Sequence, residues 1–457
     1  MTRRVLVITG SYRPAMIADM HRARMLAWDL PAAGWQPEIL AADGSYQPPS
    51  CLDTDSDEFF AGDITAHFTK AFLPRLFRAL RIGSIGWRAL VPMFFKGARL
   101  LRRKKFDLVY ITTAQFPLFL LGPLWTAFFN VPFVLDIHDP CRKDGPSTPV
   151  WARPGLKHAL SHWIMKHVES LCVRRAAGVI AVSPEYVRML ERRYERRGAP
   201  WLSAGRHAVI PFSVLPHDFE IVSRELPARS NPATTQPARI VYAGAGGPVM
   251  LRSFEVFCAA LRAHREQHPE MRDRIQIELY GTTLGWREGE TKHLLDCAKR
   301  FGIGDLVIER PGRITYRQSV RLLLDCDGAL ILGVNDSGYM PSKLFAYAYS
   351  GKPLLAILRK DSAAFALLND RPSLARVTPF DAAGEPSAAQ SKVLENFLED
   401  VIARKQFDRT DALRAFLSSA MAKRHAELFD AVLTATSPAA MIRHRFDPTD
   451  EAKRSLG

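Results

Sequence analysis

Two successive blocks of the sequence alternate between short apolar runs and stretches with helical spacing, and a polar segment separates them. The first block has apolar runs at residues 4–9, 37–41, 106–112, 132–137, 178–182 and 207–211, and the second has them at residues 239–244, 275–281, 306–309, 328–332 and 354–357. Such alternation is typical of parallel sheets covered by helices. The sequence therefore predicts an α/β protein with two doubly wound, Rossmann-like domains and a cleft between them.

The division between the blocks falls in residues 225–239, which are rich in Pro, Ser, Thr and Asn and contain few apolar side chains. This composition is typical of a linker. We therefore assign residues 1–225 to an N-terminal domain, 226–238 to a linker, 239–430 to a C-terminal domain and 431–457 to a helical tail. Ligands of such sheets bind outside the carboxyl ends of the strands, so the loops that follow the strands are the candidate sites.

The composition excludes a small module and a disordered chain. The chain has 457 residues, of which 47% are hydrophobic and 24% charged, enough for about two to four domains. Six scattered cysteines without a CxxC pair favour a reducing compartment. We expect neither a secretory leader nor a membrane span, because the chain opens directly on a strand and prolines interrupt the apolar run at residues 116–135. The expected location is the cytoplasm.

Basic residues are concentrated in one segment, although the whole chain is basic with a formal net charge of +15. Residues 64–106 contain eleven Lys and Arg, no Asp or Glu, several Phe and one Trp. A cationic segment with bulky apolar groups suits an anionic membrane surface. The expected contacts are Arg75, Arg78, Trp87, Arg88, Arg102 and Arg103. The alternative is two ordinary helices whose basic sides are solvated; nucleic acid is not expected, because no recognised binding module accompanies the charge.

A glycine-rich turn follows the first strand of the second block, in residues 241–248. Gly244, Gly246 and Gly247 allow backbone amides to approach an anion, and a following helix adds its partial positive charge, so a diphosphate is the expected ligand. Arg252, further along the same helix, is a candidate for holding a phosphate oxygen. The alternative is a tight turn without a ligand.

Residues 338–353 (GYMPSKLFAYAYSGKP) form the most specific segment of the chain. Pro341 and Ser342 suit a helix start, and Lys343 in the first helical turn is unfavourable unless an anion binds beside it. Ser342 and Lys343 are therefore candidate donor-site residues.

This segment resembles the (P)SK-x-x-E-Y-x-x-x-G-x-P signature of the family 4 glycosyltransferases, which have the GT-B fold. Residues 5–357 contain further segments similar to that family in the same order, at 5–40, 133–140, 177–183, 209–214 and 240–247. The resemblance implies a nucleotide-sugar donor in the C-terminal domain, an acceptor and a membrane surface at the N-terminal domain, and transfer with retention of configuration. It also implies that no metal or other cofactor is required and that the C-terminal tail crosses back to the N-terminal domain.

The resemblance also assigns roles near the acceptor. His138 and Asp139, at the end of an N-terminal strand, are the candidate catalytic residues, because an imidazole beside a carboxylate can orient a sugar hydroxyl or stabilise developing charge. Gly10 and Arg13, in the opening loop, are expected at the donor phosphates. Asp325-Cys-Asp327 has the DxD spacing of metal-dependent enzymes of another fold, but we interpret it as structural because it joins a helix to a strand.

The sequence departs from the family where a pair of glutamates flanks the donor. Gly338 and Ala346 occupy those positions, and Phe212 replaces an asparagine. Loss of a buried ribose contact costs about 1–3 kcal/mol. We predict a glycosyltransferase that acts on an envelope or lipid-linked glycan acceptor at the cytoplasmic membrane face. The alternatives are a catalytically silent GT-B protein that serves as a membrane-associated binding partner, and another GT-B enzyme such as a nucleotide-sugar epimerase.

Overall fold

The computed structural model of the protein describes residues 2–60, 64–72, 84–142, 156–226, 236–269, 273–283, 285–381 and 388–436. Its strands form where the sequence has apolar runs. In the first strand Val5, Leu6, Val7 and Ile8 are all fully buried. Burial on both faces is typical of parallel strands that lie between two layers of helices.

The N-terminal domain contains a seven-stranded sheet in the order β3-β2-β1-β4-β5-β6-β7, and all its strand pairs are parallel. Val7 in β1 lies between Ile39 and Tyr110 of the neighbouring strands. The strands are β1 (Arg3–Ser11), β2 (Trp35–Ala42), β3 (Ala66–Thr69), β4 (Leu108–Thr112), β5 (Phe133–Ile137), β6 (Gly178–Ala181) and β7 (His207–Val209).

The α-helices of this half are α1 (Ala18–Asp29), α3 (Ile85–Arg103), α4 (Leu121–Phe129), α5 (Leu156–Val173), α6 (Pro184–Tyr194), α7 (Pro200–Ser203) and α8 (Pro216–Ser223). Local sequence explains where several of them begin and end. Ser183 caps α6 by accepting a hydrogen bond from the Glu185 amide, and Pro184 takes the first helical position. Asn130 adopts the left-handed conformation that ends α4.

The C-terminal domain contains a six-stranded parallel sheet in the order β10-β9-β8-β11-β12-β13. Its strands are β8 (Ala238–Ala243), β9 (Ile275–Tyr280), β10 (Val307–Arg310), β11 (Gly328–Leu332), β12 (Leu354–Arg359) and β13 (Arg376–Phe380). Its helices are α9 (Leu251–Gln267), α10 (His293–Arg300), α11 (Tyr316–Asp325), α12 (Leu344–Tyr349), α13 (Ala363–Asn369), α14 (Ala388–Ile402) and α15 (Thr410–Leu413).

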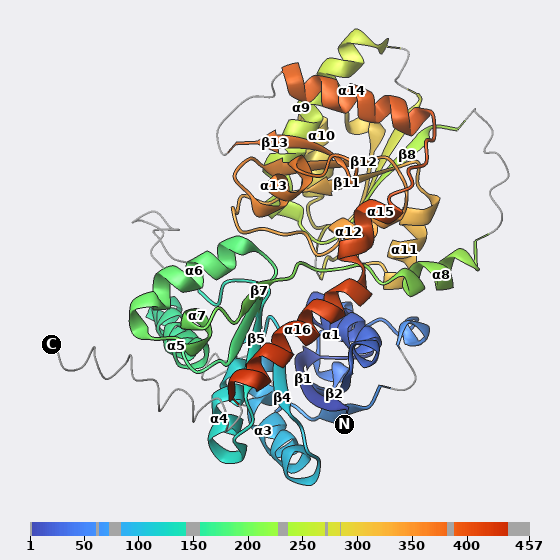
Figure 1. The fold of residues 1–457 in the computed structure, drawn as a ribbon. Coiled ribbons are helices and arrows are strands. Elements are labelled where there is room, and N and C mark those ends of the chain that lie inside the picture. Colours follow the sequence, from blue (N-terminus) through green and yellow to red (C-terminus); the bar gives the residue numbers. More distant parts are fainter. Residues whose placement is uncertain are drawn as a thin grey trace.

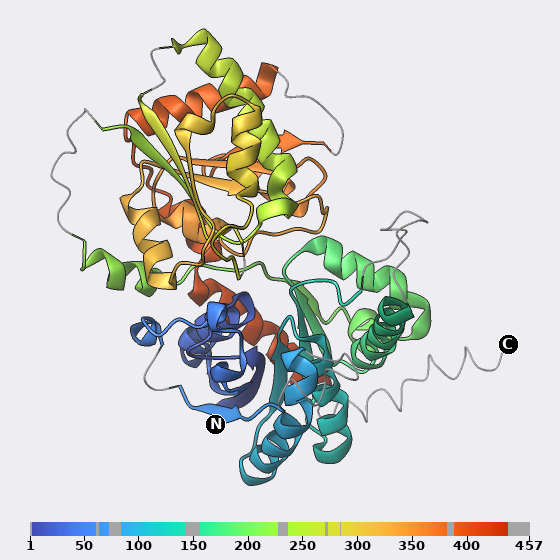
Figure 2. The same ribbon diagram turned by 180° about the vertical axis from the view of Figure 1, so that it is seen from behind.

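The last helix, α16 (Ser418–Thr436), leaves the C-terminal domain and packs against α1 of the N-terminal domain. Figures 1 and 2 show the two sheets in separate lobes, with α16 running from one lobe along the other. The order of each sheet reverses beside its first strand, between β1 and β4 and between β8 and β11, and ligands of such sheets bind at these points. The predicted class of two facing Rossmann-like domains, the GT-B architecture, is confirmed.

The basic segment is only partly at the surface. Arg88, on α3, is 6% exposed, and its Nε donates a hydrogen bond to Phe72 O at 2.7 Å. The prediction that Arg88 contacts a membrane is therefore wrong, because its guanidinium is buried and donates a hydrogen bond to the backbone of the same domain. Trp87 is half-buried, whereas Arg102 and Arg103 are exposed. Arg75 and Arg78 lie outside the described residues, as do most of the predicted linker and residues 437–457 of the predicted tail.

Among the described residues, none of the helices combines the length and the apolar character needed to cross a bilayer. The apolar run at 116–135 instead forms a 3₁₀ turn, helix α4 and the start of β5. Its prolines explain this division, because each removes a backbone donor.

Candidate functional site

A cavity of about 440 Å³ lies between the two domains, at the carboxyl ends of their strands. The loop after β1, helix α1 and the residues after β7 form its N-terminal wall, including Met16, His21 and Phe212. The loops after β8, β9 and β10 and the residues before α12 form its C-terminal wall. The cavity therefore occupies the place where both sheets expose their strand ends.

The glycine turn and Lys343 meet in this cavity. Lys343 Nζ donates a hydrogen bond of 2.5 Å to Ala243 O, the last carbonyl of β8. A Cβ atom at Gly244 would lie 2.7 Å from the same Nζ, so a side chain there would displace the ammonium group. Helix α12 begins at Leu344, so Lys343 precedes the helix and is not in its first turn as predicted. Ser342 also lines the cavity.

Two further basic side chains, His21 and Arg313, line the same cavity. Arg313 follows β10, and its Nη2 donates to Met16 O of the N-terminal domain. Desolvation inside the cleft and the neighbouring Arg313 lower the pKa of Lys343 to about 8. Burial, together with Arg24, Lys343 and Arg313, lowers the pKa of His21 well below its ordinary value. An anion between these groups would reverse the electrostatic part of these shifts.

No acidic side chain is among the described residues that line the cavity. Lys343, Arg313 and His21 therefore face one another without a carboxylate between them. Much of the remaining wall is apolar, including Met25, Val320 and Leu323. A mostly apolar pocket with a few convergent polar groups is typical of a small-molecule site, and these groups suit an anion such as a diphosphate.

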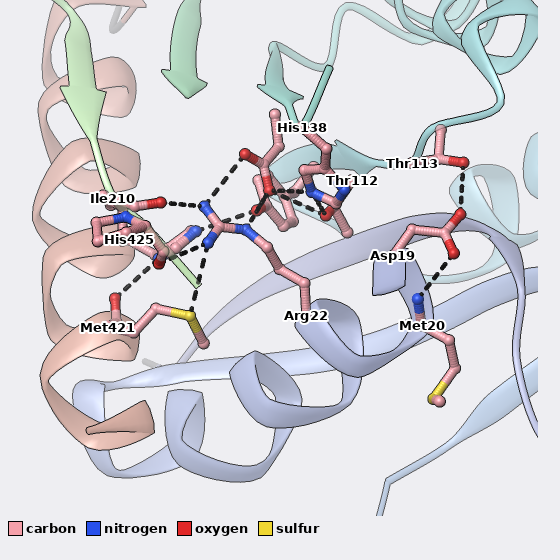
Figure 3. Close-up of polar contacts among 12 residues, drawn as sticks. Asp19, Met20, Arg22, Thr112, Thr113, His138, Ile210, Met421 and His425 are labelled. Atoms are coloured by element: carbon pink, nitrogen blue, oxygen red, sulfur yellow. Dashed lines mark hydrogen bonds and ion pairs between the residues drawn. The ribbon is translucent and has the colours of Figure 1, made fainter. Parts of the chain in front are cut away.

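Figure 3 shows His138 beside Thr112 and Arg22 in one network of polar contacts. The network is centred on the buried Asp136, and His138 does not line this cavity. Its Nε2 lies 3.0 Å from Asp136 Oδ2, which also accepts hydrogen bonds from Arg22 Nε at 2.5 Å and Thr112 Oγ1 at 2.9 Å. Burial alone would raise the pKa of Asp136, but Arg22 and His138 outweigh it and hold the pKa well below its ordinary value. Because an ionised carboxylate only accepts, the Nε2 atom carries the proton.

Phe212 lies between the His138 ring and the cavity. The two rings are 5.2 Å apart, and Phe212 lines the cavity while His138 lies behind it. His138 Nδ1 has no hydrogen-bond partner among the described residues. Phe212, which stands in place of an asparagine, therefore separates the predicted catalytic imidazole from the cavity.

Asp139, the residue after His138, is exposed. Burial raises the pKa values of Tyr186 and Tyr339, and the Asp139 carboxylate raises both further. Tyr339 lines the cavity. Asp139 thus lies near the cavity wall at the point where an N-terminal loop approaches the C-terminal domain.

The other predicted residues do not converge on the cavity. Gly10 packs beneath Gln115 and Thr113, and a Cβ atom there would lie 2.6 Å from Gln115 Cγ. Arg13 is exposed in the opening loop and does not line the cavity. Arg252 Nε donates to Asp381 O at 3.4 Å, and Nη1 lies 3.6 Å from Glu255 Oε2. The three residues therefore lie outside the cavity in this conformation.

Gly246 and Gly247 shape the turn after Gly244 without lining the cavity. Gly247 has a φ of +29°, and Gly246 leaves room for Met250, whose Sδ would lie 2.2 Å from a Cβ atom. The DxD pair has structural partners: Asp325 pairs with Arg239 at 2.9 Å, and Asp327 accepts the Arg239 amide at 2.9 Å.

Residues 21–212 match the sequence profile of the family described as the glycosyl transferase 4-like domain. The N-terminal domain is a glycosyl transferase 4-like domain. No curated protein matches the sequence.

Solved structures with the same fold cover nearly the whole chain. Sucrose-phosphate synthase from Thermosynechococcus elongatus is 15% identical with a TM-score of 0.57, covering 95% of this chain and 100% of that chain. HepE from Anabaena in complex with UDP and glucose is 16% identical with a TM-score of 0.57, covering 93% and 99%. The trehalose-phosphate synthase from Burkholderia vietnamiensis is 13% identical with a TM-score of 0.61, covering 95% and 100%. These likenesses show the GT-B fold.

The two positions where the family 4 resemblance implies glutamates differ in their surroundings. Ala346 lines the cavity. Gly338 instead packs against Tyr186, across the boundary between the C-terminal domain and the glycosyl transferase 4-like domain. A Cβ atom at Gly338 would lie 2.3 Å from Tyr186 Cε1. Glycine is therefore required at residue 338 while Tyr186 keeps this position.

The sequence analysis missed Arg313 and His21. Arg313 follows a predicted strand at residues 306–309, so the rule that site residues follow strand ends could have indicated it. His21 has no comparable signal, because it lies within a helix and reaches the cavity only through the packing of the glycosyl transferase 4-like domain against the C-terminal domain.

Proposed function

We propose that the protein transfers a sugar, with retention of configuration, from a nucleoside-diphosphate sugar to an envelope or lipid-linked glycan acceptor at the cytoplasmic membrane face. The observation that carries this proposal is the convergence of Lys343, Arg313 and His21 on the interdomain cavity beside the Gly244 turn. The glycosyl transferase 4-like match and the UDP and glucose bound by HepE support the choice of donor class.

In the proposed reaction the diphosphate leaves the sugar while the Lys343 ammonium and the Arg313 guanidinium stabilise its charge. Fixed cations in a partly desolvated cleft stabilise a leaving group more strongly than water does. Both side chains are already held by backbone carbonyls, those of Ala243 and Met16, so little reorganisation is needed. Lys343 and Arg313 therefore supply the leaving-group side of the proposed reaction.

The acceptor side is proposed to involve His138 and Asp139. Asp136 holds the His138 imidazole from one side, which leaves Nδ1 as its one unused hydrogen-bonding atom among the described residues. A shift of the Phe212 side chain would open His138 to a hydroxyl group in the cleft, and the next residue, Asp139, is exposed.

A catalytically silent nucleotide-binding protein is the second candidate, and it is favoured by Gly338 and Ala346 at the expected glutamate positions. Donor hydrolysis separates the two candidates. The proposed enzyme releases nucleoside diphosphate from one of a panel of uridine and guanosine diphosphate sugars, whereas the silent protein binds the donor without turnover.

The nucleotide site is tested by calorimetry with uridine and guanosine diphosphates. We expect binding to one of them, and a loss of about tenfold or more in affinity for Lys343→Ala, because a charge-assisted contact contributes about 1.5–3 kcal/mol. Lys299→Ala is the matched control, since Lys299 is exposed on α10. Absence of binding by the folded protein would overturn the proposal, as would equal affinity of both variants.

A further inference from the structure

Four apolar side chains of α3 and α4 are exposed on one face of the N-terminal domain. Val91 and Phe95 on α3 are 47% and 66% exposed, and Leu124 and Phe128 on α4 are 40% and 68% exposed. The Phe94 ring connects the two helices, with its centroid 5.4 Å from Phe95 and 6.0 Å from Phe128. A contiguous apolar patch of this kind marks an interaction site more often than single exposed apolar residues do.

The two helices hold this face in a fixed shape. Gly97 of α3 lies flat against the buried Trp125 of α4, so closely that a Cβ atom would be 2.2 Å from Trp125 Cζ2. Trp125 Nε1 donates a hydrogen bond of 3.3 Å to Phe94 O. The groove between the helices is therefore built into the fold and does not depend on mobile side chains alone.

Basic side chains form one side of this groove, which we call the α3/α4 groove. Its lining consists of Phe94, Phe95, Lys96, Ala98, Arg99, Arg102, Arg103, Phe128 and Phe129, and its volume is about 690 Å³. The guanidinium of Arg102 lies 5.7 Å from the centre of the Phe129 ring. Neither helix contains an acidic residue. The four cations have no ion-pair partner in the part of the chain that the structure describes.

We propose that the α3/α4 groove docks the protein onto an anionic lipid bilayer. Exposed phenylalanines enter the interfacial region, while Lys96, Arg99, Arg102 and Arg103 contact lipid phosphates. Charge complementarity selects this partner, because unpaired cations beside an apolar surface match the two layers of a bilayer interface. The inference extends the proposed function by naming its membrane contact, and it replaces the buried Arg88 with residues of α4 that the basic segment does not include.

The position of the groove bears on the acceptor that the proposed function needs. Gly86, whose amide donates to Gln115 Oε1 at 3.2 Å, lies at the carboxyl edge of the sheet. Phe95 lies nine residues further along α3, about 14 Å along the helix axis. Figures 1 and 2 show α3 and α4 at the end of the lobe away from the C-terminal domain. A docked bilayer therefore favours an acceptor whose sugar extends well beyond its lipid phosphate.

Co-sedimentation with vesicles tests the docking without any donor, so its failure is distinguishable from failure of the proposed transfer reaction. The full-length protein is mixed with vesicles of phosphatidylcholine alone or with added phosphatidylglycerol. We expect it to pellet only with the anionic vesicles and to be released by high salt. The triple variant Arg99→Gln, Arg102→Gln, Arg103→Gln should bind about a hundredfold more weakly, because each basic side chain contributes about 1 kcal/mol.

The double variant Phe95→Ser, Phe128→Ser tests the apolar contribution and should bind about tenfold or more weakly to the same vesicles. Trp163→Ser, which changes an exposed aromatic residue on α5, is the matched control and should bind like the wild type. Thermal unfolding verifies that each variant is folded. Wild-type protein that stays in the supernatant overturns the proposal, as does equal binding of the groove variants and the control. A dimer that the double variant converts to a monomer also overturns it, since the groove would then bind a second copy.

Discussion

The ammonium group of Lys343 is the best-defined charge in the cavity, since its carbonyl partner, its glycine neighbour and its opposing guanidinium are all identified. Its lowered pKa means that burial in the cleft, together with the neighbouring Arg313, disfavours the positive charge of Lys343. A bound diphosphate would favour that charge, so binding and protonation are linked.

This linkage predicts how nucleotide affinity depends on pH. Below pH 8 Lys343 is already protonated and affinity should be nearly constant; above its pKa of about 8, each unit should weaken binding by about tenfold, because a proton must be taken up. Calorimetry with nucleoside diphosphate between pH 7.5 and 10 measures this. In Lys343→Arg the guanidinium does not titrate in this range, so the slope should disappear. A wild-type affinity that is unchanged up to pH 10 would contradict the assignment.

The two residues at the expected glutamate positions should respond differently to replacement. Ala346→Glu should raise nucleotide affinity by about tenfold, because residue 346 lines the cavity and a carboxylate there can accept ribose hydroxyls. Gly338→Glu should give no gain and lower Tm by about 5 °C, because its Cβ collides with Tyr186. Calorimetry and thermal unfolding measure the two effects.

Two controls accompany this pair of variants. Tyr186→Ala removes a buried side chain and lowers Tm by itself, but Gly338→Glu should lower Tm less in the Tyr186→Ala background than in the wild type, since the collision partner is removed. Ala403→Glu adds the same carboxylate at an exposed position after α14 and should leave affinity unchanged. Equal affinity of Ala346→Glu and Ala403→Glu would show that residue 346 does not face the nucleotide.

At the scale of elements, α16 is held on the N-terminal domain through a buried polar contact. His425 Nδ1 donates to Met421 O at 2.8 Å, and Nε2 lies 3.0 Å from the Tyr110 hydroxyl. Burial, with the nearby Arg22, lowers the pKa of His425 to about 3. The imidazole is therefore neutral where α16 crosses between the domains.

This contact predicts that acid destabilises the protein. Between pH 6.5 and 3 the unfolded state binds a proton at His425 that the folded state does not, so stability falls with falling pH by about 1.4 kcal/mol per unit from this residue. His21 adds a similar dependence, because its pKa is also lowered. Urea unfolding at pH 7, 6 and 5 measures the slope. In His425→Gln the slope of stability against pH should be smaller by about 1.4 kcal/mol per unit, since the titrating imidazole is removed. A slope equal to that of the wild type would exclude this role for His425.

The sequence predicts those strands that are buried on both faces, because a strand buried in this way appears in the sequence as an uninterrupted apolar run. β1 and β11 are buried along nearly their whole length, and their runs are easily recognised. The edge strands β3 and β13 are partly exposed and contain polar residues or proline, so no such run marks them. The same limit applies to α3, whose basic face suggested a surface helix without showing that Arg88 is buried.

The candidate site divides in a similar way. Lys343 was found because the residues around it form a recognisable segment. Arg313 and His21 were not, because they reach the cavity only when loops far apart in the sequence pack together, as in the contact between Arg313 and Met16. Arg252 had a plausible spacing, but its guanidinium lies beside Asp381 and Glu255 instead of the cavity. The spacing of residues within one segment indicates which of them share a face of a helix. It does not indicate which residues of the other domain lie opposite that face.

At the scale of the whole molecule, Tyr316 at the start of α11 joins the two domains. Its amide donates to Asp53 Oδ2 at 2.7 Å, and its hydroxyl donates to Asp218 Oδ2 at 2.6 Å. Asp218 also accepts hydrogen bonds from both terminal nitrogens of Arg24, at 2.8 and 2.6 Å. The Tyr316 ring packs against His21, with centroids 4.4 Å apart. The same residue therefore fixes the domain arrangement and supports a side chain of the cavity.

Removal of the Tyr316 hydroxyl should loosen the arrangement of the domains without unfolding either one. A hydrogen bond to a charged group contributes about 1.5–3 kcal/mol, so Tyr316→Phe should shift any equilibrium between closed and open arrangements by about tenfold or more toward the open one. Small-angle scattering should then give a larger radius of gyration, and nucleotide affinity should fall because His21 and Arg313 no longer meet. Tyr280→Phe removes a similar hydrogen bond, to Glu278 at 2.6 Å within the C-terminal domain, and should change neither quantity. If both variants scatter and bind alike, the contact at Tyr316 does not set the width of the cleft.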